Sequence, residues 1–508
     1  MDYPPNGIWP QIGPDIIYAG GDVLLEELYS VSLSEDGTRV LLGEGSVGTV
    51  SIFDYASNND TWIDAGEFNV GERFGQSLAA SSSGNSFVVG NTFFDEFKGM
   101  AKVFEFQSGI WSQKGADILG ENVGDFLGFA VSMSGDGNRI AVGIPFYDAG
   151  MTADQFDKGI VQTFLWDSDS SSWEQFGGNI VGETQGDRSG YSLAMSDDGN
   201  SLAVAATFND GEDADGNILR NSGQVRVYSC SVVLRWRQQG SDIDGLTEYS
   251  GNPLQVDISA DGLKVLIGYP SANDERGNVV AYELIEEIPI VGSISQDTGL
   301  GIGTEWNRYG DVLFGESVGD MFGSSVSMSN DGTAIFIGAP GADGSNNVGV
   351  GYVYSYDQQN KTWEFATDDS STEAFGTAMS SDGNTIATLS TSFAQVFRFQ
   401  VDTESPSLSP TISKTPTIAP TVSSAPTTSS APSSDPRKTL FELISDLVSL
   451  VPVITPPVSP PPIGAAAIIL PLIPAVLSIF LVINAMIPGT YLNEWLLYII
   501  DWVQWWWG

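Results

Sequence analysis

The first 400 residues of the chain consist of short stretches with a regular order of apolar and polar positions, separated by Gly-containing turns. AVSMS at 130–134 alternates and leads into an Asp-Gly turn, and IAVG at 140–143 is continuously apolar. GYVYSY at 351–356 and the tryptophan stretch WSQKGADILG at 111–120 represent two further kinds of stretch. Alternation rich in Val, Ile, Tyr and Phe, with Gly and Asp-Gly between, predicts short antiparallel strands. Because no helical period runs through this part, we expect an all-β domain.

These four stretches recur as a unit. GDFLGFAVSMSGDGNRIAVGIP at 124–145 is matched by GDMFGSSVSMSNDGTAIFIGAP at 319–340. A turn glycine and a tryptophan each recur seven times in strict alternation, at intervals of 47 to 70 residues: Gly37, Gly84, Gly137, Gly199, Gly262, Gly332 and Gly383, and Trp9, Trp62, Trp111, Trp173, Trp236, Trp306 and Trp363. Four strands per unit at this period predict a ring of sheets, a β-propeller.

The two ends of the repeat array are complementary. The array begins with a tryptophan stretch at 9–20 that no other strand precedes, and it ends at AQVFRFQV, 394–401, without a tryptophan stretch. An open ring would leave exposed sheet edges, which promote aggregation. We therefore expect residues 1–402 to form a seven-bladed β-propeller of four-stranded antiparallel blades, closed by the N-terminal strand. The tryptophans are expected to cover the outer strand of each blade.

Phe-Gly before the alternating strand and Gly-Ala-Pro after the apolar strand make the unit specific. FGSSVSMSNDGTAIFIGAP at 322–340 resembles the FG-GAP repeat, which builds the seven-bladed heads of integrin α-subunits and of many surface proteins. The resemblance implies a cell-surface binding or adhesion protein. Glycine at this place permits a sharp bend or a close backbone approach.

The family's calcium loop is missing here. In integrins the turn between the first two strands is longer and binds calcium through several Asp residues, whereas this chain has SGDG or SNDG with one carboxylate, such as Asp136 or Asp331. Calcium needs six to eight oxygen ligands. We predict no cofactor and interpret the Asp-Gly pairs as hairpin turns. The acidic loop at 209–223 supplies only weak metal candidates, Asp210, Asp213 and Asp215.

Charge and residue types exclude several functions. The chain has 20 Lys plus Arg against 64 Asp plus Glu, a net charge of -44, and this repels nucleic acid. It has no His, so a Ser-His-Asp triad is impossible. Its one cysteine, Cys230, is expected to be buried in a strand. GEGSVG at 43–48 lies between two strands, where no helix follows to hold a pyrophosphate.

Beyond the propeller the composition changes twice. Residues 403–438 are rich in Ser, Thr and Pro, which predicts an extended, disordered, O-glycosylated stalk. After an amphipathic and Pro-rich juxtamembrane segment, 439–462, residues 463–487 are apolar and uncharged, long enough for a transmembrane helix that contacts membrane lipid. The Trp-rich tail, 488–508, is expected at the lipid interface.

We expect a single-pass membrane protein with its propeller outside the cell or in a lumen. The stalk, the resemblance and two N-glycosylation sequons, at Asn59 and Asn360, support this, whereas the start MDYPPNGIWP has no signal peptide. The leading hypothesis is a non-enzymatic surface module that binds an extracellular protein or glycan. The alternative is an extracellular propeller enzyme that cleaves polysaccharide with paired carboxylates.

Overall fold

The computed structural model describes residues 7–17, 29–45, 48–69, 74–148, 157–212, 216–230, 235–251, 253–286, 304–342, 349–369, 376–390 and 393–401. These residues belong to one compact unit, Met1–Thr403. The predicted stalk, juxtamembrane segment, membrane span and tail lie outside the described residues. None of the helices in the described ranges has the length and apolar character needed to span a membrane.

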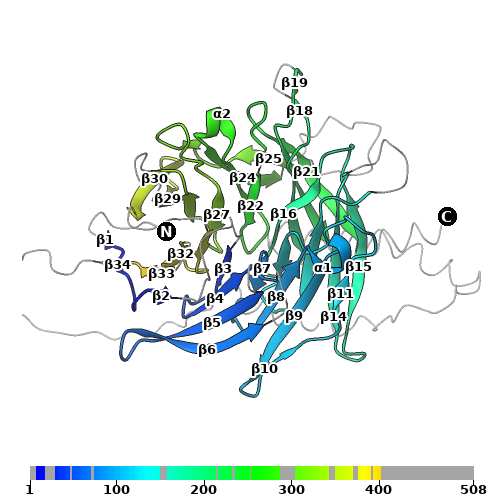
Figure 1. The fold of residues 1–508 in the computed structure, drawn as a ribbon. Helices are drawn as coiled ribbons and strands as arrows, with labels where there is room; N and C mark the ends of the chain where they lie inside the picture. Colours follow the sequence, from blue (N-terminus) through cyan, green and yellow to red (C-terminus); the bar gives the residue numbers. More distant parts are fainter. Residues whose placement is uncertain are drawn as a thin grey trace, which may run out of the picture. The chain divides into compact units, whose positions relative to one another are not determined.

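Seven sheets of four antiparallel strands stand around a common axis (Figure 1). The first three blades are β3 (Tyr29–Leu33), β4 (Arg39–Glu44), β5 (Thr49–Ala56), β6 (Thr61–Asn69); β7 (Leu78–Ala80), β8 (Ser86–Asn91), β9 (Met100–Gln107), β10 (Ile110–Gln113); and β12 (Val131–Met133), β13 (Arg139–Ile144), β14 (Ile160–Asp167), β15 (Ser172–Val181). The next three are β16 (Ser189–Met195), β17 (Ser201–Ala206), β20 (Gln224–Cys230), β21 (Trp236–Asp244); β22 (Gln255–Ile258), β23 (Lys264–Tyr269), β24 (Asn278–Glu286), β25 (Thr304–Arg308); and β27 (Ser325–Met328), β28 (Ala334–Ala339), β29 (Val350–Asp357), β30 (Thr362–Asp369). The predicted seven-bladed, four-stranded architecture is confirmed.

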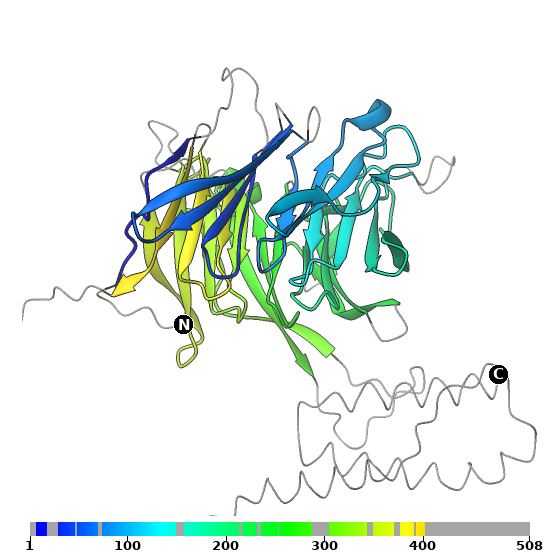
Figure 2. The ribbon, with the colours of Figure 1, turned by 90° about the horizontal axis from the view of Figure 1, so that it is seen from below.

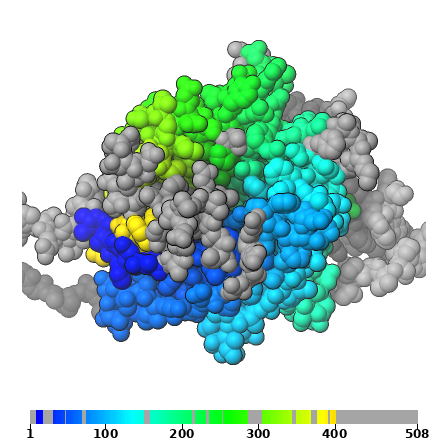
Figure 3. Space-filling model, viewed as in Figure 1, coloured from blue at the N-terminus to red at the C-terminus, as the bar shows by residue number. Residues whose placement is uncertain are grey.

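The seventh blade is completed from the N-terminus, as the sequence predicts. It consists of β31 (Gly376–Met379), β32 (Thr385–Leu389), β33 (Phe393–Arg398) and, on the outside, β2 (Ile16–Ile17). Gln11 pairs with Phe397, and β1 (Gly7–Ile8) pairs with β34 (Gln400–Val401). Figures 1 and 3 show the blue N-terminal residues beside the yellow C-terminal strands. The Trp9 and Phe399 ring centroids lie 5.5 Å apart.

A closed ring of backbone hydrogen bonds joins the hairpins that connect the first and second strands. Each bond runs from the N–H of the residue two positions before the turn glycine to the same position in the following blade, at 2.7 to 3.2 Å. The seven members are Glu35, Ser82, Gly135, Asp197, Ala260, Asn330 and Ser381. Because Ser381 donates back to Glu35, the ring closes at seven members.

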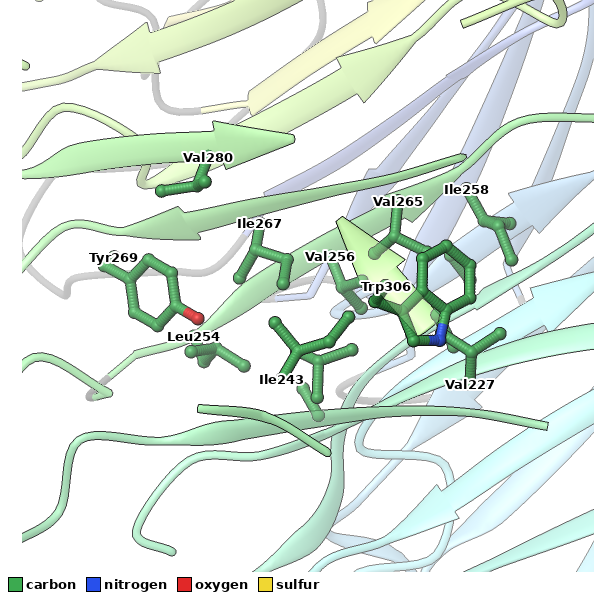
Figure 4. Close-up of a cluster of buried hydrophobic side chains, with 14 of the residues drawn as sticks. Val227, Ile243, Leu254, Val256, Ile258, Val265, Ile267, Tyr269, Val280 and Trp306 are labelled. Atoms are coloured by element: carbon green, nitrogen blue, oxygen red, sulfur yellow. The ribbon is translucent and has the colours of Figure 1, made fainter. Parts of the chain in front are cut away.

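The core lies between blades, and each blade buries side chains on both faces. One cluster joins the fourth and fifth blades through residues such as Val227, Ile243, Val265 and Tyr269 (Figure 4). Phe74 and Phe322 of the Phe-Gly pairs are buried in such clusters, so the predicted packing between sheets is confirmed.

Glycines of the repeat bring neighbouring backbones into contact. A Cβ built on Gly143 would lie 2.1 Å from the carbonyl oxygen of Gly190, and a Cβ on Gly268 would lie 2.3 Å from that of Gly323. Each pair joins the Gly that ends one blade's apolar strand to the Gly that opens the next blade. The close approach expected of the Phe-Gly glycines is therefore confirmed, and no side chain fits there.

The propeller has two distinct ends. We name the hairpin face the end that carries the seven turn glycines and the turns between third and fourth strands. We name the loop face the opposite end, formed by the connections between second and third strands and between blades. Arg398 pairs with Thr385, which follows the Gly383 turn, so the chain reaches Val401 at the hairpin face. Figure 2 shows the blades edge-on, with the blue helix α1 (Phe94–Phe97) at the upper end.

The loop face carries the small elements that the repeat pattern does not predict. These are α1, α2 (Ala272–Glu275), the inserted hairpin β18 (Gly211–Glu212) and β19 (Ile218–Leu219), and the short strands β11 (Ile118–Leu119) and β26 (Leu313–Phe314). Their irregular backbones set this end apart from the uniform hairpin face.

Candidate functional site

The Asp-Gly pairs form hairpin turns, as predicted. All seven turn glycines have φ between 64° and 72°. The carboxylate of Asp136 accepts hydrogen bonds from Ser134 Oγ at 2.6 Å and from the Asn138 N–H at 2.9 Å. The same two contacts recur at Asp36, Asp198, Asp261, Asp331 and Asp382.

These contacts lower the pKa of the hairpin carboxylates Asp136 and Asp331. Burial acts to raise the pKa of Asp136, but the hydrogen bonds from Ser134 and Asn138 outweigh it and lower the pKa below its ordinary value. The pKa of Asp331 is lowered against burial in the same way by Ser329 and Thr333. Since the oxygens serve the turn, these carboxylates are structural.

Five of the repeat tryptophans donate a hydrogen bond to the preceding blade. Trp306 Nε1 donates to the carbonyl of Gln239 at 2.8 Å, and the Cβ of the next residue, Gly240, would lie 2.6 Å from the Trp306 ring. Equivalent bonds run from Trp62, Trp173 and Trp363 to the carbonyls of Ile12, Lys114 and Tyr309. Trp236 donates to Thr163 Oγ1, and the buried Nε1 of Trp111 has no hydrogen-bond partner among the described residues. The tryptophans on the outer strands therefore bridge blades, besides covering them.

Few basic residues are available, and several reach across blades at the hairpin face. Arg139 Nη1 donates to the carbonyl of Gly199 at 3.0 Å, and Lys114 Nζ donates to that of Gly137 at 3.0 Å. Arg398 donates to the carbonyl of Gly37 at 3.1 Å, which joins the seventh blade to the first. These contacts satisfy turn carbonyls, so the side chains serve the fold.

The weak metal candidates are not gathered into a site among the described residues. Asp210 is exposed, and its Oδ1 accepts the N–H of Asn221 at 2.8 Å. Asp213 and Asp215 lie outside the described residues. In the ranges that the structure describes, no group of three or more Cys, Asp or Glu side chains is placed to hold a metal ion. Cys230 is buried at the end of β20, and burial raises the pKa of its thiol.

A polar groove of about 710 Å³ lies on the hairpin face over the seventh, first and second blades. It is lined by residues that include Glu35, Arg39, Asp54 and Asp382. Arg39 Nε and Nη2 donate to Asp54 at 2.6 and 2.8 Å, and Asp382 accepts bonds within its own hairpin. Among the charged groups of the groove, Arg39 and Asp54 therefore pair with each other, whereas Asp36 and Asp382 accept hydrogen bonds from neutral groups of their own hairpins.

The loop face concentrates backbone strain. Twelve of the 16 described non-glycine residues with positive φ lie there: Asp95, Glu96, Phe97, Phe126, Asp157, Arg188, Asn221, Tyr249, Asn273, Asp274, Glu275 and Met321. Such conformations cost free energy and cluster at functional sites. They lie in equivalent loops of several blades, so the strained conformations recur with the repeat at this end.

Four of the strained residues occupy the same position before an inner strand. The N–H of Phe126 donates to the carbonyl of Phe97 at 2.9 Å, and that of Met321 donates to the carbonyl of Glu275 at 2.8 Å. Arg188 and Tyr249 make the equivalent bonds to the preceding blade. The preceding blade therefore holds each strained residue in place.

The loop face also exposes apolar surface. Of the 17 described large apolar side chains that are exposed, eleven belong to this end: Ile17, Phe94, Phe97, Leu119, Val123, Val181, Ile218, Leu246, Tyr249, Phe314 and Val318. Loops on a rigid scaffold usually carry recognition, and exposed apolar side chains among them can contribute to an interface. The loop face is therefore the candidate functional site.

An arginine is fixed between two rings on this face. The Arg188 guanidinium carbon lies 4.6 Å from the ring centroids of both Phe146 and Phe208, and Nη2 lies 3.1 Å from Asp157 Oδ2. The Phe146 and Phe126 centroids are 4.8 Å apart. These contacts hold the loops between the third and fourth blades rigid.

Two patterns in the sequence mark the tryptophan bridges and the strained loops, although neither feature was predicted from them. The spacing Trp-x-x-x-Gly recurs from Trp9–Gly13 to Trp306–Gly310 and marks the tryptophan bridges. In a second pattern, Asn, Thr or Ser is followed by any residue and then by Gly-Asp, as in Ser317–Asp320, and this pattern marks strained loops. In this example the Ser317 N–H donates to the Asp320 carboxylate at 2.7 Å.

No family model and no curated protein matches the chain. Among solved structures, hydrazine synthase of Kuenenia stuttgartiensis is similar with a TM-score of 0.46 and 15% identity, over 76% of this chain and 100% of that chain. The β-propeller domain of Cps50 (Swd1) of Myceliophteria thermophila is similar with a TM-score of 0.43 and 9% identity, over 76% and 99%. The chain's own hydrogen bonds define it as a seven-bladed β-propeller.

Proposed function

We propose that the chain is a membrane-tethered, cell-surface binding module whose loop face contacts an extracellular protein or glycan. One observation carries this proposal: the strained and apolar residues gather at one end of the propeller, while the chain leaves at Val401 at the other end. A binding head on a stalk needs this arrangement, because its ligand surface must point away from the tether.

The repeat supports the surface location. The approach between Gly268, of the IGYP stretch, and Gly323, of the next Phe-Gly pair, gives the two glycines of an FG-GAP-like repeat a common physical role. Such repeats build the heads of surface receptors, and the Ser/Thr/Pro-rich segment 403–438 followed by the apolar segment 463–487 has the composition of a stalk and an anchor. We propose on this basis that the repeat is of the FG-GAP kind and that the propeller is extracellular.

The test compares loop-face and hairpin-face variants of the propeller, residues 1–402, on cell surfaces, protein extracts and a glycan array. Val318→Asp and Leu119→Asp together place charge on the loop face, where these side chains are 71% and 54% exposed. Ile110→Asp is the matched control, since Ile110 is 69% exposed in a hairpin at the opposite end.

We expect the double variant to lower binding at least tenfold and the control to bind like the wild type. Equal loss in both, or unchanged binding of the double variant, would contradict the use of the loop face. A hydrolysis assay on the polysaccharides of the array runs in parallel. Release of product would favour the alternative, an extracellular carboxylate-dependent enzyme.

A further inference from the structure

We infer that Asn59 and Asn360 are attachment sites for N-linked glycans and that both glycans border the hairpin face. The two asparagines are the only ones in the chain followed by X-Thr or X-Ser with X other than Pro. Both are exposed, and both lie in the turn between the third and fourth strands of a blade. The turns are closed by the equivalent pairs Ala56–Thr61 and Asp357–Thr362.

The backbone of the two turns has the same shape. The residue after each asparagine has positive φ, 48° at Asp60 and 58° at Lys361. Each asparagine therefore lies at the exposed tip of its hairpin, where there is access for a bulky sugar. Asn360 Nδ2 donates to the Asp357 carboxylate, a local contact on the protein surface that a linked sugar can replace.

The two sites leave the loop face free. Turns between third and fourth strands lie at the same end as Val401, from which the stalk leaves. With no other sequon in the chain, both glycans would lie at the hairpin face and leave the strained, apolar end bare. This part of the inference rests on the extracellular location under the proposed function.

Asn59 also lies beside the seam that closes the ring. The carboxylate of Asp60, its neighbour, accepts the N–H of Gly13 at 2.7 Å and the hydroxyl of Tyr55 at 2.7 Å. Gly13 belongs to the N-terminal segment that completes the seventh blade. A glycan on Asn59 would therefore cover the place where the two ends of the propeller meet.

The experiment uses the full chain behind an added secretory leader in a eukaryotic cell, followed by peptide-N-glycosidase digestion. We expect digestion to lower the apparent mass on a denaturing gel in two steps for the wild type, in one step for Asn59→Gln or Asn360→Gln, and not at all for the double variant. Thr61→Ser and Thr362→Ser keep the sequons and should keep both steps. Mass spectrometry should find Asn59 and Asn360 converted to Asp by the enzyme.

A secreted wild type without either conversion would overturn the inference, as would a decrease in apparent mass on digestion that persists in the double variant. Secretion of the Asn→Gln variants shows that a missing step reflects the loss of a glycan and not a failure to fold. Ligand binding is measured separately on the double variant and should equal that of the wild type. The glycan inference and the binding proposal can therefore fail independently.

Discussion

Trp62 Nε1 donates a 3.0 Å hydrogen bond to the carbonyl of Ile12, which joins the first blade to the N-terminal segment of the seventh. Inside the array, Trp306 and Gln239 make the same link between the fifth and fourth blades. The junction that closes the ring is therefore built like the junctions within it. The N-terminal segment acts as the outer part of the last blade and belongs to the fold.

The glycine beside each tryptophan bridge should resist substitution. In Gly240→Ala the new Cβ would lie 2.6 Å from the Trp306 ring, at φ 68°. We expect a loss of about 3 kcal/mol in the free energy of unfolding, from backbone strain and overpacking together. Gly109→Ala is the control, because Gly109 has φ 82° and no atom within 4 Å of the new Cβ. Denaturant unfolding should give about 1 kcal/mol for the control, and equal losses would contradict the bridge.

The backbone approach between blades gives a second prediction. Gly143→Ala would place a Cβ 2.1 Å from the Gly190 carbonyl oxygen, and neither backbone can withdraw without opening the blades. We expect a loss of at least about 3 kcal/mol, or no folding. In Gly376→Ala the nearest atom is the Leu389 Cδ1, at 3.1 Å, which can turn away. Thermal unfolding of both variants measures the difference, and a mild Gly143→Ala would show that the approach is unimportant.

The tryptophan hydrogen bond can be isolated by comparing two partly buried tryptophans. Trp173→Phe removes a donor to the Lys114 carbonyl, whereas Trp111→Phe removes an Nε1 that has no partner. Both lose similar volume. We expect Trp173→Phe to cost about 1 kcal/mol more, because a partly buried carbonyl is left unsatisfied. Chemical denaturation of both variants measures this, and a larger cost for Trp111→Phe would be inconsistent with the bridge.

Much of the fold can be predicted from the sequence because strands and turns have characteristic local sequence patterns. Gly137 marks a turn since its φ of 69° suits glycine, and Ser134 and Asp136 supply the hydrogen bonds that shape it. The number of repeats then gives the number of blades. The unpaired stretch around Trp9 predicted the closure correctly.

The candidate site is only partly predictable from the sequence, because the Trp-x-x-x-Gly and Gly-Asp patterns mark positions but not the residues of the preceding blade that they contact. Phe126 and Met321 are ordinary residues in the sequence, and only hydrogen bonds to Phe97 and Glu275 of the preceding blade hold them at positive φ. Contacts between blades depend on how sheets pack, which periodicity does not encode. The same holds for Trp62 and Ile12, which are 50 residues apart in the chain.

Asp257 predicts an unusual pH dependence of stability. It occupies the position of Ser32 and Ser327 in an inner strand, and its carboxylate accepts the N–H groups of Ile258 and Met328, both at 2.8 Å. Burial raises its pKa to about 6, despite these hydrogen bonds, above the ordinary value of 3.8. The folded protein therefore binds this proton more tightly than the unfolded chain, so this group favours folding below pH 4 and loses that contribution as the pH rises through 6.

Asp257→Ser should thus stabilise the protein at pH 8, by about 1–2 kcal/mol because the side chain keeps some exposure. Its advantage over the wild type should shrink as the pH falls from 6 to 4. Parallel denaturation curves across this range give the difference. A variant that is less stable at pH 8 would contradict the raised pKa.

The most direct test of the closed seven-bladed ring is a disulfide between its two ends. Ile8 and Gln400 are paired residues of β1 and β34, within reach of a disulfide. In a Cys230→Ala background, cysteines at positions 8 and 400 should form an intramolecular disulfide under mild oxidation and raise the unfolding temperature. Cysteines at 8 and 107, with Gln107 in the second blade, should not. The closure would be contradicted if the disulfide between positions 8 and 400 failed to form within one molecule, or if the disulfide between positions 8 and 107 formed equally well.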